Sequence, residues 1–300
     1  TPGATLYSQN TLGTARGMLG YSYLHGRSGV HAKFSYSGFY PVFELQVHYN
    51  DKEMDYKGRH SIRTSAIAYI PWQFNYGGWN RGITPQIMWS YRNDQELYTK
   101  LFVKQDVERQ QLIGAVRGYC VLPVAAAQIY PRWGIGASAR TGFNPNGGDK
   151  FGSIYTWYVY GYVPGIFWNQ GLKLTAGYQY QDIGRHTYWL GNQIDMPRGM
   201  DDEYGTKYLR LTADYAIPVY LGDVSLGCIA YLKRLQIIPF ADYGRLKKLS
   251  GWKNMHALGG DVILDGNFFR IGYPASLGFR YANNGAGQNY GALLFSITFD

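Results

Sequence analysis

The chain has 300 residues, a net charge of +9 and only 16% charged residues, and its 39 glycines and 29 tyrosines exceed ordinary usage. No stretch of about 18 consecutive apolar residues occurs, so the sequence excludes a membrane-spanning helix. The Arg and Lys residues are scattered singly, without a basic cluster or an RNA-binding signature. We therefore expect no nucleic-acid partner.

Alternation of apolar and polar residues, the period of a β-strand, recurs along most of the chain. Residues 1–13 are polar and irregular, and we interpret them as a periplasmic lead-in. Nine strand segments are expected before residue 184, at 16–24, 30–36, 42–49, 62–70, 83–91, 109–121, 132–141, 151–162 and 171–181. Five more follow a long loop, at 207–217, 224–243, 255–264, 268–281 and 290–299, with a β-bulge near Arg234.

These segments predict an all-β fold, a transmembrane antiparallel up-and-down β-barrel formed by residues 14–300. We count fourteen strands, or sixteen if a further pair lies within 1–13 or 93–108. An even number places both termini on the periplasmic side. A soluble barrel or sandwich is the alternative, but it would bury many Tyr and Trp side chains in a wide interior. Aromatic residues at one turn suit a membrane interface or are ordinary turn residues: Trp72, Tyr76 and Trp79.

The last strand carries its apolar residues on one face, which we expect to contact lipid. It is also the closing side of a barrel seam. Glycines cluster at its start, and glycine weakens strand pairing. The predicted seam residues are Gly291, Phe295, Ile297 and Phe299.

If the apolar face of each strand points outward, the opposite face lines a polar lumen with an excess of basic residues. Such a lumen favours anions or acidic peptide segments, or holds a structural network of ion pairs. The expected lumen-lining residues are Lys33, Arg63, Arg140, Lys173, Arg210, Asp214 and Arg280, together with Glu44.

From residue 185 onward a more specific pattern appears. A long loop at 184–205 carries the segment MPRGM around Arg198 and Gly199, and the downstream segment IIPFADYGR contains Phe240, Asp242 and Gly244. The Arg-Gly dipeptide also occurs at 16–17, 81–82 and 117–118, so its downstream context selects Arg198. Physically, an arginine at the tip of a loop folded toward the lumen can form a bidentate pair with an inward aspartate. We predict that Arg198 pairs with Asp242; the alternative is a solvated loop arginine.

This ordered set of motifs over residues 185–300 resembles the BamA/TamA/two-partner-secretion superfamily of outer-membrane β-barrels. In that superfamily an extracellular loop with an Arg-Gly-aromatic motif precedes the last five strands, and Phe-x-Asp-x-Gly lies in the strand that follows. Phe240, Asp242 and Gly244 match the second motif, whereas Met200 stands where an aromatic residue is usual. The superfamily barrels have sixteen strands.

The resemblance implies a bacterial outer-membrane protein that acts in outer-membrane protein assembly or polypeptide translocation through a weak seam between the first and last strands. Its expected partners are outer-membrane lipids and other outer-membrane or periplasmic assembly proteins and lipoproteins. Two alternatives remain open. One is a structural scaffold barrel that anchors periplasmic or lipoprotein partners, and the other is a diffusion porin or channel.

Catalytic chemistry has little support in the sequence. The six histidines lie on separate segments, so the sequence alone locates no Ser-His-Asp or paired-carboxylate arrangement. Metal-ligand spacing such as HxxxH or CxxC does not occur. We expect no enzyme activity, no catalytic residues, no metal and no cofactor.

Overall fold

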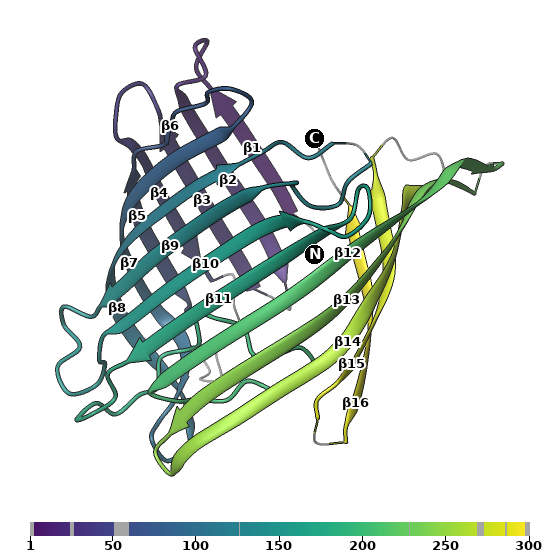
Figure 1. The fold of residues 1–300 in the computed structure, drawn as a ribbon. Helices are drawn as coiled ribbons and strands as arrows, with labels where there is room; N and C mark the ends of the chain where they lie inside the picture. The colour runs from purple at the N-terminus through teal and green to yellow at the C-terminus, as the bar shows by residue number, and fades with distance from the viewer. Residues whose placement is uncertain are drawn as a thin grey trace.

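The computed structural model describes residues 3–24, 27–50, 60–125, 127–227, 229–268, 273–285 and 287–297. These residues form an all-β protein with one large antiparallel sheet (Figure 1). No helix in this part of the chain is long and apolar enough to cross a membrane. The strands are β1 (Gly3–Gln9), β2 (Ala15–Leu24), β3 (Arg27–Tyr36), β4 (Val42–Tyr49), β5 (Ile62–Tyr69), β6 (Trp72–Gln73), β7 (Asn80–Tyr98), β8 (Lys104–Val121), β9 (Gly134–Phe143), β10 (Ile154–Pro164), β11 (Gly171–Gln181), β12 (Lys207–Leu226), β13 (Ala230–Lys248), β14 (Gly251–Phe268), β15 (Ala275–Asn283) and β16 (Asn289–Ile297).

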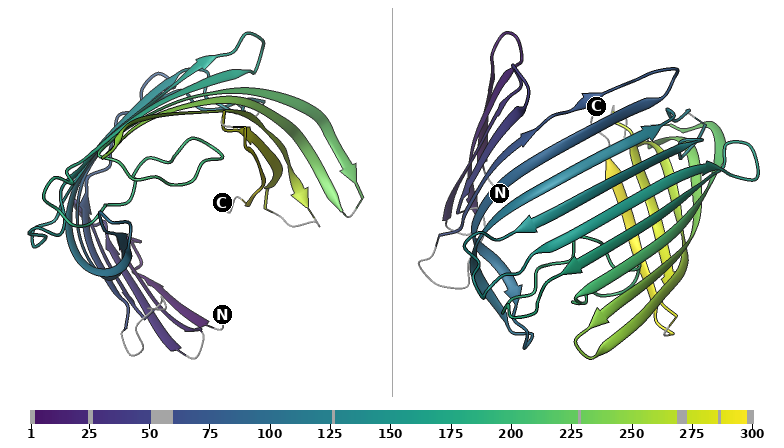
Figure 2. Two further views of the ribbon diagram at one scale, coloured as in Figure 1. Left: turned by 90° about the horizontal axis from the view of Figure 1, so that it is seen from below. Right: turned by 60° about the vertical axis from the view of Figure 1, so that its left-hand side comes forward.

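The connectivity is up-and-down, because each strand pairs with its neighbours in the sequence. The ladder runs from β1 to β16, and the two-residue strand β6 lies off this path and pairs with β7. Figure 2 shows the sheet curved around a concave side, with β1 and β16 at its two outer edges. Within the described residues no ladder joins these two edge strands. The all-β, up-and-down part of the sequence prediction is confirmed.

The predicted count of fourteen strands is wrong, since the described residues form sixteen. The expected irregular lead-in at 1–13 contains β1, which pairs with β2 from Gly3 opposite Ser22 to Gln9 opposite Arg16. Its sequence, GATLYSQ, is short and places Leu6 and Tyr7 side by side, so no apolar alternation marked it. The segment 93–108 adds no strand pair, because it extends β7 and β8 across a register shift.

Fifteen strands lie on the continuous path, so β1 and β16 run in the same direction (Figure 1). Gly3 and Ile297, the first and last described residues, therefore lie toward opposite ends of the sheet, which contradicts the expectation that the start and the end of the chain share one side. The predicted bulge near Arg234 is present as a register shift between Leu232 and Arg234. The turn expected near residues 218–223 instead follows Leu226, because β12 continues to that residue.

The register divides the side chains between two faces of the sheet. Side chains of the convex face include many large apolar groups that are exposed, among them Leu19, Phe34, Leu45, Ile87, Trp157, Leu174, Leu211, Val262, Phe279 and Leu293. The concave face carries most of the charged and polar side chains. This distribution is the reverse of a soluble protein, in which a sheet buries its apolar face.

Candidate functional site

A long connection between β11 and β12, residues 182–206, lies on the concave side of the sheet (Figure 2). We call it the inner loop. Its first half binds the tip of the β7–β8 hairpin through backbone hydrogen bonds. The Lys100 amide donates a hydrogen bond to the Thr187 carbonyl at 3.0 Å, and the Trp189 amide donates one to the Tyr98 carbonyl at 2.8 Å. The β7–β8 hairpin thus supports the first half of the inner loop.

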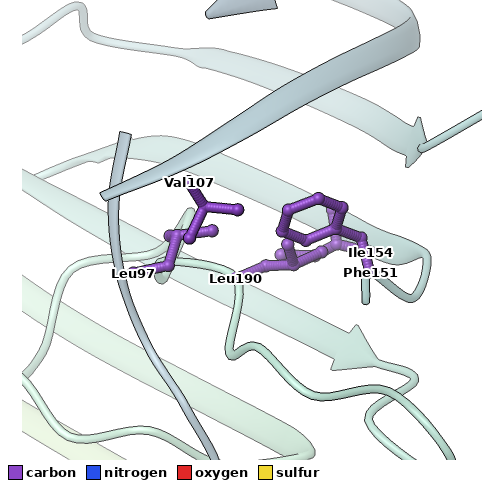
Figure 3. Packing of buried hydrophobic residues seen from close by; sticks show 5 residues of the cluster. All are labelled: Leu97, Val107, Phe151, Ile154 and Leu190. Atoms are coloured by element: carbon purple, nitrogen blue, oxygen red, sulfur yellow. The ribbon is translucent and has the colours of Figure 1, made fainter. Parts of the chain in front are cut away.

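An apolar cluster fixes the same half of the inner loop (Figure 3). Leu190 of the loop is 1% exposed and packs with Leu97, Val107, Phe151 and Ile154, which come from β7, β8, the β9–β10 connection and β10. The neighbouring Trp189 is also 1% exposed. Burial of a leucine side chain stabilises a fold by about 1.5–3 kcal/mol, so this contact is a strong anchor.

Polar groups of the sheet hold the middle of the loop. The side chain of Gln179 on β11 accepts a hydrogen bond from the Gln193 amide at 2.7 Å and donates to Asn192 Oδ1 at 3.2 Å. The Tyr208 hydroxyl of β12 donates to the Asp195 carbonyl at 3.0 Å. Because Gln179 and Tyr208 are almost fully buried, these bonds satisfy polar groups that have lost water.

A second apolar cluster lies under the tip of the loop. Ile194 and Met196 pack with Tyr208, Leu246 and Met255, which belong to β12, β13 and β14. Met200, which follows the Arg-Gly dipeptide of the loop, is partly buried and packs against this cluster. A flexible methionine fills the irregular gap without the flat ring of an aromatic residue.

Arg198 forms the predicted pair with Asp242 of β13. Its Nε donates to Asp242 Oδ2 at 2.8 Å, its Nη2 donates to Oδ1 at 2.6 Å, and its own backbone amide donates to Oδ2 at 2.9 Å. Nη2 also contacts Asp214 Oδ1 on β12. The Asp242 side chain is fully buried and that of Arg198 is 13% exposed. The alternative of a solvated loop arginine is therefore wrong.

Aromatic stacking adds to this charge pairing. The Arg198 guanidinium carbon lies 3.5 Å from the centroid of the Phe240 ring, and Arg280 approaches the same ring at 5.9 Å. Arg280 is itself held by Asp261, with its Nη2 at 2.7 Å from Asp261 Oδ2. A guanidinium over an aromatic face contributes about 0.5–2 kcal/mol. Phe240 therefore supports Arg198 from the side that Asp242 leaves open.

Glycines permit the close approach of loop and sheet. A Cβ at Gly244 would lie 2.9 Å from Cγ of Pro197, so only glycine leaves room for the loop there. Gly199 has a positive φ of 78°, and its Cβ would lie 3.0 Å from Cβ of Tyr290 on β16. The motif residues Phe240, Asp242 and Gly244 thus lie on one face of β13 and provide stacking, pairing and space.

Electrostatics keep this arginine charged. Burial by itself would lower the pKa of Arg198, but the hydrogen bonds and negative charges of Asp242 and Asp214 raise that pKa above its ordinary value. Arg210 lies 3.7 Å from Asp242 and adds a second positive charge to the same carboxylate. The site is thus a network of two arginines and two aspartates around the loop tip.

The predicted lumen-lining residues all share the concave face, because the ladders connect their positions with even spacing from β3 to β15. The structure does not bring them into one site. Arg210, Asp214 and Arg280 surround Arg198, whereas Lys33 pairs with Glu44 at 3.0 Å on β3 and β4. Lys173 faces the ring of Tyr130 at 6.0 Å. Arg63 and Arg140 lie together elsewhere, in the cavity considered below.

Three of the four predicted seam residues, Gly291, Phe295 and Ile297, lie on the edge strand β16. Gly291 pairs with Tyr281 and Phe295 pairs with Leu277, both on β15, and Phe295 is 65% exposed. Ile297 shares the face of Phe295, while Phe299 lies outside the described residues. The other edge belongs to β1, so the first strand expected at 16–24 is an interior strand.

Sequence reasoning missed the contacts that hold the first half of the loop. A role for Gln179 could have been predicted, because it lies on the polar face of the strand expected at 171–181, and that face points into the lumen. The pairing of Leu190 with the β7–β8 hairpin had no local signal. Arg117, which belongs to the Arg-Gly dipeptide at residues 117–118, lies within strand β8. It is therefore not at the tip of a loop, which agrees with the selection of Arg198.

Within the described ranges, no group of three His, Cys, Asp or Glu side chains is arranged to hold a metal ion. No protein-family model matches the sequence, and a search of curated proteins finds no significant match.

Proposed function

We propose that the chain is a transmembrane β-barrel of the bacterial outer membrane that acts in the assembly or translocation of polypeptides. The observation that carries this proposal is the constellation around Arg198. The four residues that the resemblance selects, Arg198, Phe240, Asp242 and Gly244, contact one another or the same loop tip on the concave face. A shared arrangement of this kind supports kinship with the insertase and polypeptide-transporter superfamily.

The two faces of the sheet support a membrane location. The exposed apolar side chains of the convex face would contact lipid, and the polar concave face would enclose a lumen. Aromatic residues gather in turns at one end of the sheet, at the position expected for a membrane interface. They include Phe39, Tyr40, Trp72, Tyr76, Phe167 and Trp168, all exposed.

The free edges of β1 and β16 support a role for the seam. An edge strand presents unpaired backbone amides and carbonyls, which can pair with an incoming strand. Both edges carry exposed apolar side chains, Leu6 at 69% on β1 and Leu293 at 88% on β16. Because the two edge strands run in the same direction, a direct ladder between them would be parallel, and parallel pairing is slightly weaker per residue. A weak junction is the property that strand insertion needs.

Reconstitution tests the proposal. The purified chain is placed in liposomes, and the folding of an unfolded outer-membrane β-barrel substrate into those liposomes is followed by its changed migration on unheated gels. The proposal expects faster substrate folding than in liposomes that contain an inert barrel protein. Equal rates in both preparations would contradict the assembly function and favour the scaffold alternative. Saturating ion conductance without any effect on substrate folding would favour the channel.

A further inference from the structure

A cavity of about 350 Å³ lies between the concave face of β4, β5, β7, β8 and β9 and the inner loop, which contributes Gly191 and Gln193. It is separate from the Arg198 network. Four arginines line it, Arg63 from β5, Arg92 from β7, Arg109 from β8 and Arg140 from β9.

Negative charge in this wall is scarce. Arg63 and Arg92 share one carboxylate, Asp94, whose oxygens lie 2.6 Å and 3.4 Å from the two Nε atoms. Among the cavity-lining side chains that the structure describes, four are arginines and none is a carboxylate, and Asp94 pairs with two of the four.

Arg109 and Arg140 have no carboxylate partner in the part of the chain that the structure describes. Arg109 is only 6% exposed, and its hydrogen bonds go to the neutral oxygens of Asn144 at 2.7 Å and Gln95 at 3.4 Å. Arg140 makes no hydrogen bond or ion pair among those residues, and its side chain is exposed to the cavity. An uncompensated charge in a partly dry wall is costly, so a site of this composition favours an anion.

Two other arginines of the concave face, in contrast, are paired with aspartates. Arg234 and Arg280 each have their own aspartate, Asp265 at 2.8 Å and Asp261 at 2.7 Å. The described arginines Arg234 and Arg280 are thus each neutralised by an aspartate, whereas Arg109 and Arg140 of the cavity have no carboxylate partner among the described residues. This contrast separates the cavity from a general network of ion pairs.

We propose that this cavity binds a small organic anion with two or three negative charges carried by phosphate or carboxylate groups. The guanidinium forks of Arg109 and Arg140 fit both groups, because each presents parallel N–H donors. Met88 and Ile113 supply apolar wall for the organic part of the ligand. Small-molecule pockets occupy about 300–1,000 Å³, so the cavity suits a metabolite and not a polymer.

The test is calorimetric titration of the detergent-solubilised full chain with tripolyphosphate and, separately, with citrate. These probes distinguish phosphate from carboxylate recognition. Saturable binding is expected for at least one probe, and Arg140→Gln is expected to weaken it about tenfold, equivalent to about 1.4 kcal/mol. Arg140→Lys, which keeps the charge but loses the fork, should weaken binding less.

Lys173→Gln is the matched control, because Lys173 is a cation of the same concave face outside the cavity. It should leave probe binding unchanged. Equal weakening by Arg140→Gln and Lys173→Gln would overturn the proposal, since binding would then reflect only the overall charge of the concave face. Absence of saturable binding of both probes up to about 10 mM would overturn it as well. Because Arg140 makes no hydrogen bond or ion pair with the residues that the structure describes, its substitution should preserve the fold, and an unchanged gel migration of the variant verifies this.

Discussion

The guanidinium of Arg198 lies over the ring of Phe240, with its carbon 3.5 Å from the ring centroid, while its nitrogens bind the carboxylate two residues further along β13. One face of β13 therefore supplies both the aromatic ring that stacks on Arg198 and the carboxylate that pairs with it. The inner loop that carries Arg198 begins at the end of a different strand, β11. This arrangement fixes the tip of the inner loop in position and in direction. The loop can leave the sheet only if both interactions are lost together.

Asp242→Asn should release the loop tip. The substitution removes the charge from a fully buried carboxylate and leaves Arg198 with Asp214 alone, and loss of one partner of a buried pair costs about 3–5 kcal/mol. Hydrogen–deuterium exchange of peptides that cover residues 192–200 should rise sharply, with little change in β2–β5. Asp214→Asn is the graded control, because Asp214 accepts only one of the bonds of Arg198, and it should give a smaller rise. Unchanged exchange in Asp242→Asn would show that the apolar clusters alone hold the loop.

Gly199→Ala should loosen the same tip for two separable reasons. The positive φ of 78° disfavours any residue with a Cβ by about 1–2 kcal/mol, and the added methyl would also press on Tyr290 at 3.0 Å. Gly287→Ala is the matched control, since Gly287 has a φ of 82° but no atom within 4 Å of its Cβ position. The temperature at which folded protein converts to the unfolded gel form should fall further for Gly199→Ala. Equal decreases would mean that the contact with β16 contributes nothing.

The sequence could predict those parts of this architecture that depend on interactions between residues close together in the chain. Alternation along a strand is a property of neighbouring residues, and it placed Lys173 on β11 and Arg280 on β15 on the correct face, four strands apart. The pair Arg198–Asp242 was predictable because an arginine at the tip of a loop folded toward the lumen can form a bidentate pair with an aspartate on the inward face of a strand. The strand β1 was not predictable, because it is short and its two large apolar side chains, Leu6 and Tyr7, are adjacent in sequence and so do not alternate with polar residues. The contact of Leu190 with Leu97 joins residues far apart in sequence and depends on how the β7–β8 hairpin bends over the sheet.

Leu190→Ala should free the first half of the inner loop. Removal of a buried leucine side chain costs about 2–5 kcal/mol, depending on how well the cavity closes, and Leu190 is 1% exposed between Leu97 and Phe151. Limited proteolysis with trypsin should then cut at Arg185 in folded protein within a shorter time than in the parent chain. Leu101→Ala, in the hairpin tip that the loop contacts, is the control because Leu101 is 85% exposed. If both variants are cut at the parental rate, the backbone bonds to Tyr98 and Lys100 suffice to hold this half.

Glu203 gives the last part of the inner loop a dependence on pH. Its carboxylate lies 2.6 Å from Nζ of Lys253 and 2.9 Å from Nζ of Lys248, at the tip of the β13–β14 hairpin. Partial burial alone would raise the pKa of Glu203, but these two lysines lower it below its usual 4.5. Since the folded pKa is depressed, the contribution of this contact is fully present above the unfolded value and is lost as pH falls through the folded one. Both lysines are substantially exposed, so the contribution is below about 1 kcal/mol.

A spin label at Asp201→Cys should therefore report constant, restricted motion from neutral pH down to about pH 5 and greater motion below the usual glutamate pKa. In a background that carries Glu203→Gln, the label should already be more mobile at neutral pH, and acid should change it much less, because the titrating carboxylate is gone. Equal mobility of the two proteins at neutral pH would contradict a role for Glu203 in holding the loop. An acid response that persists undiminished in Glu203→Gln would instead assign the pH dependence to the neighbouring aspartates.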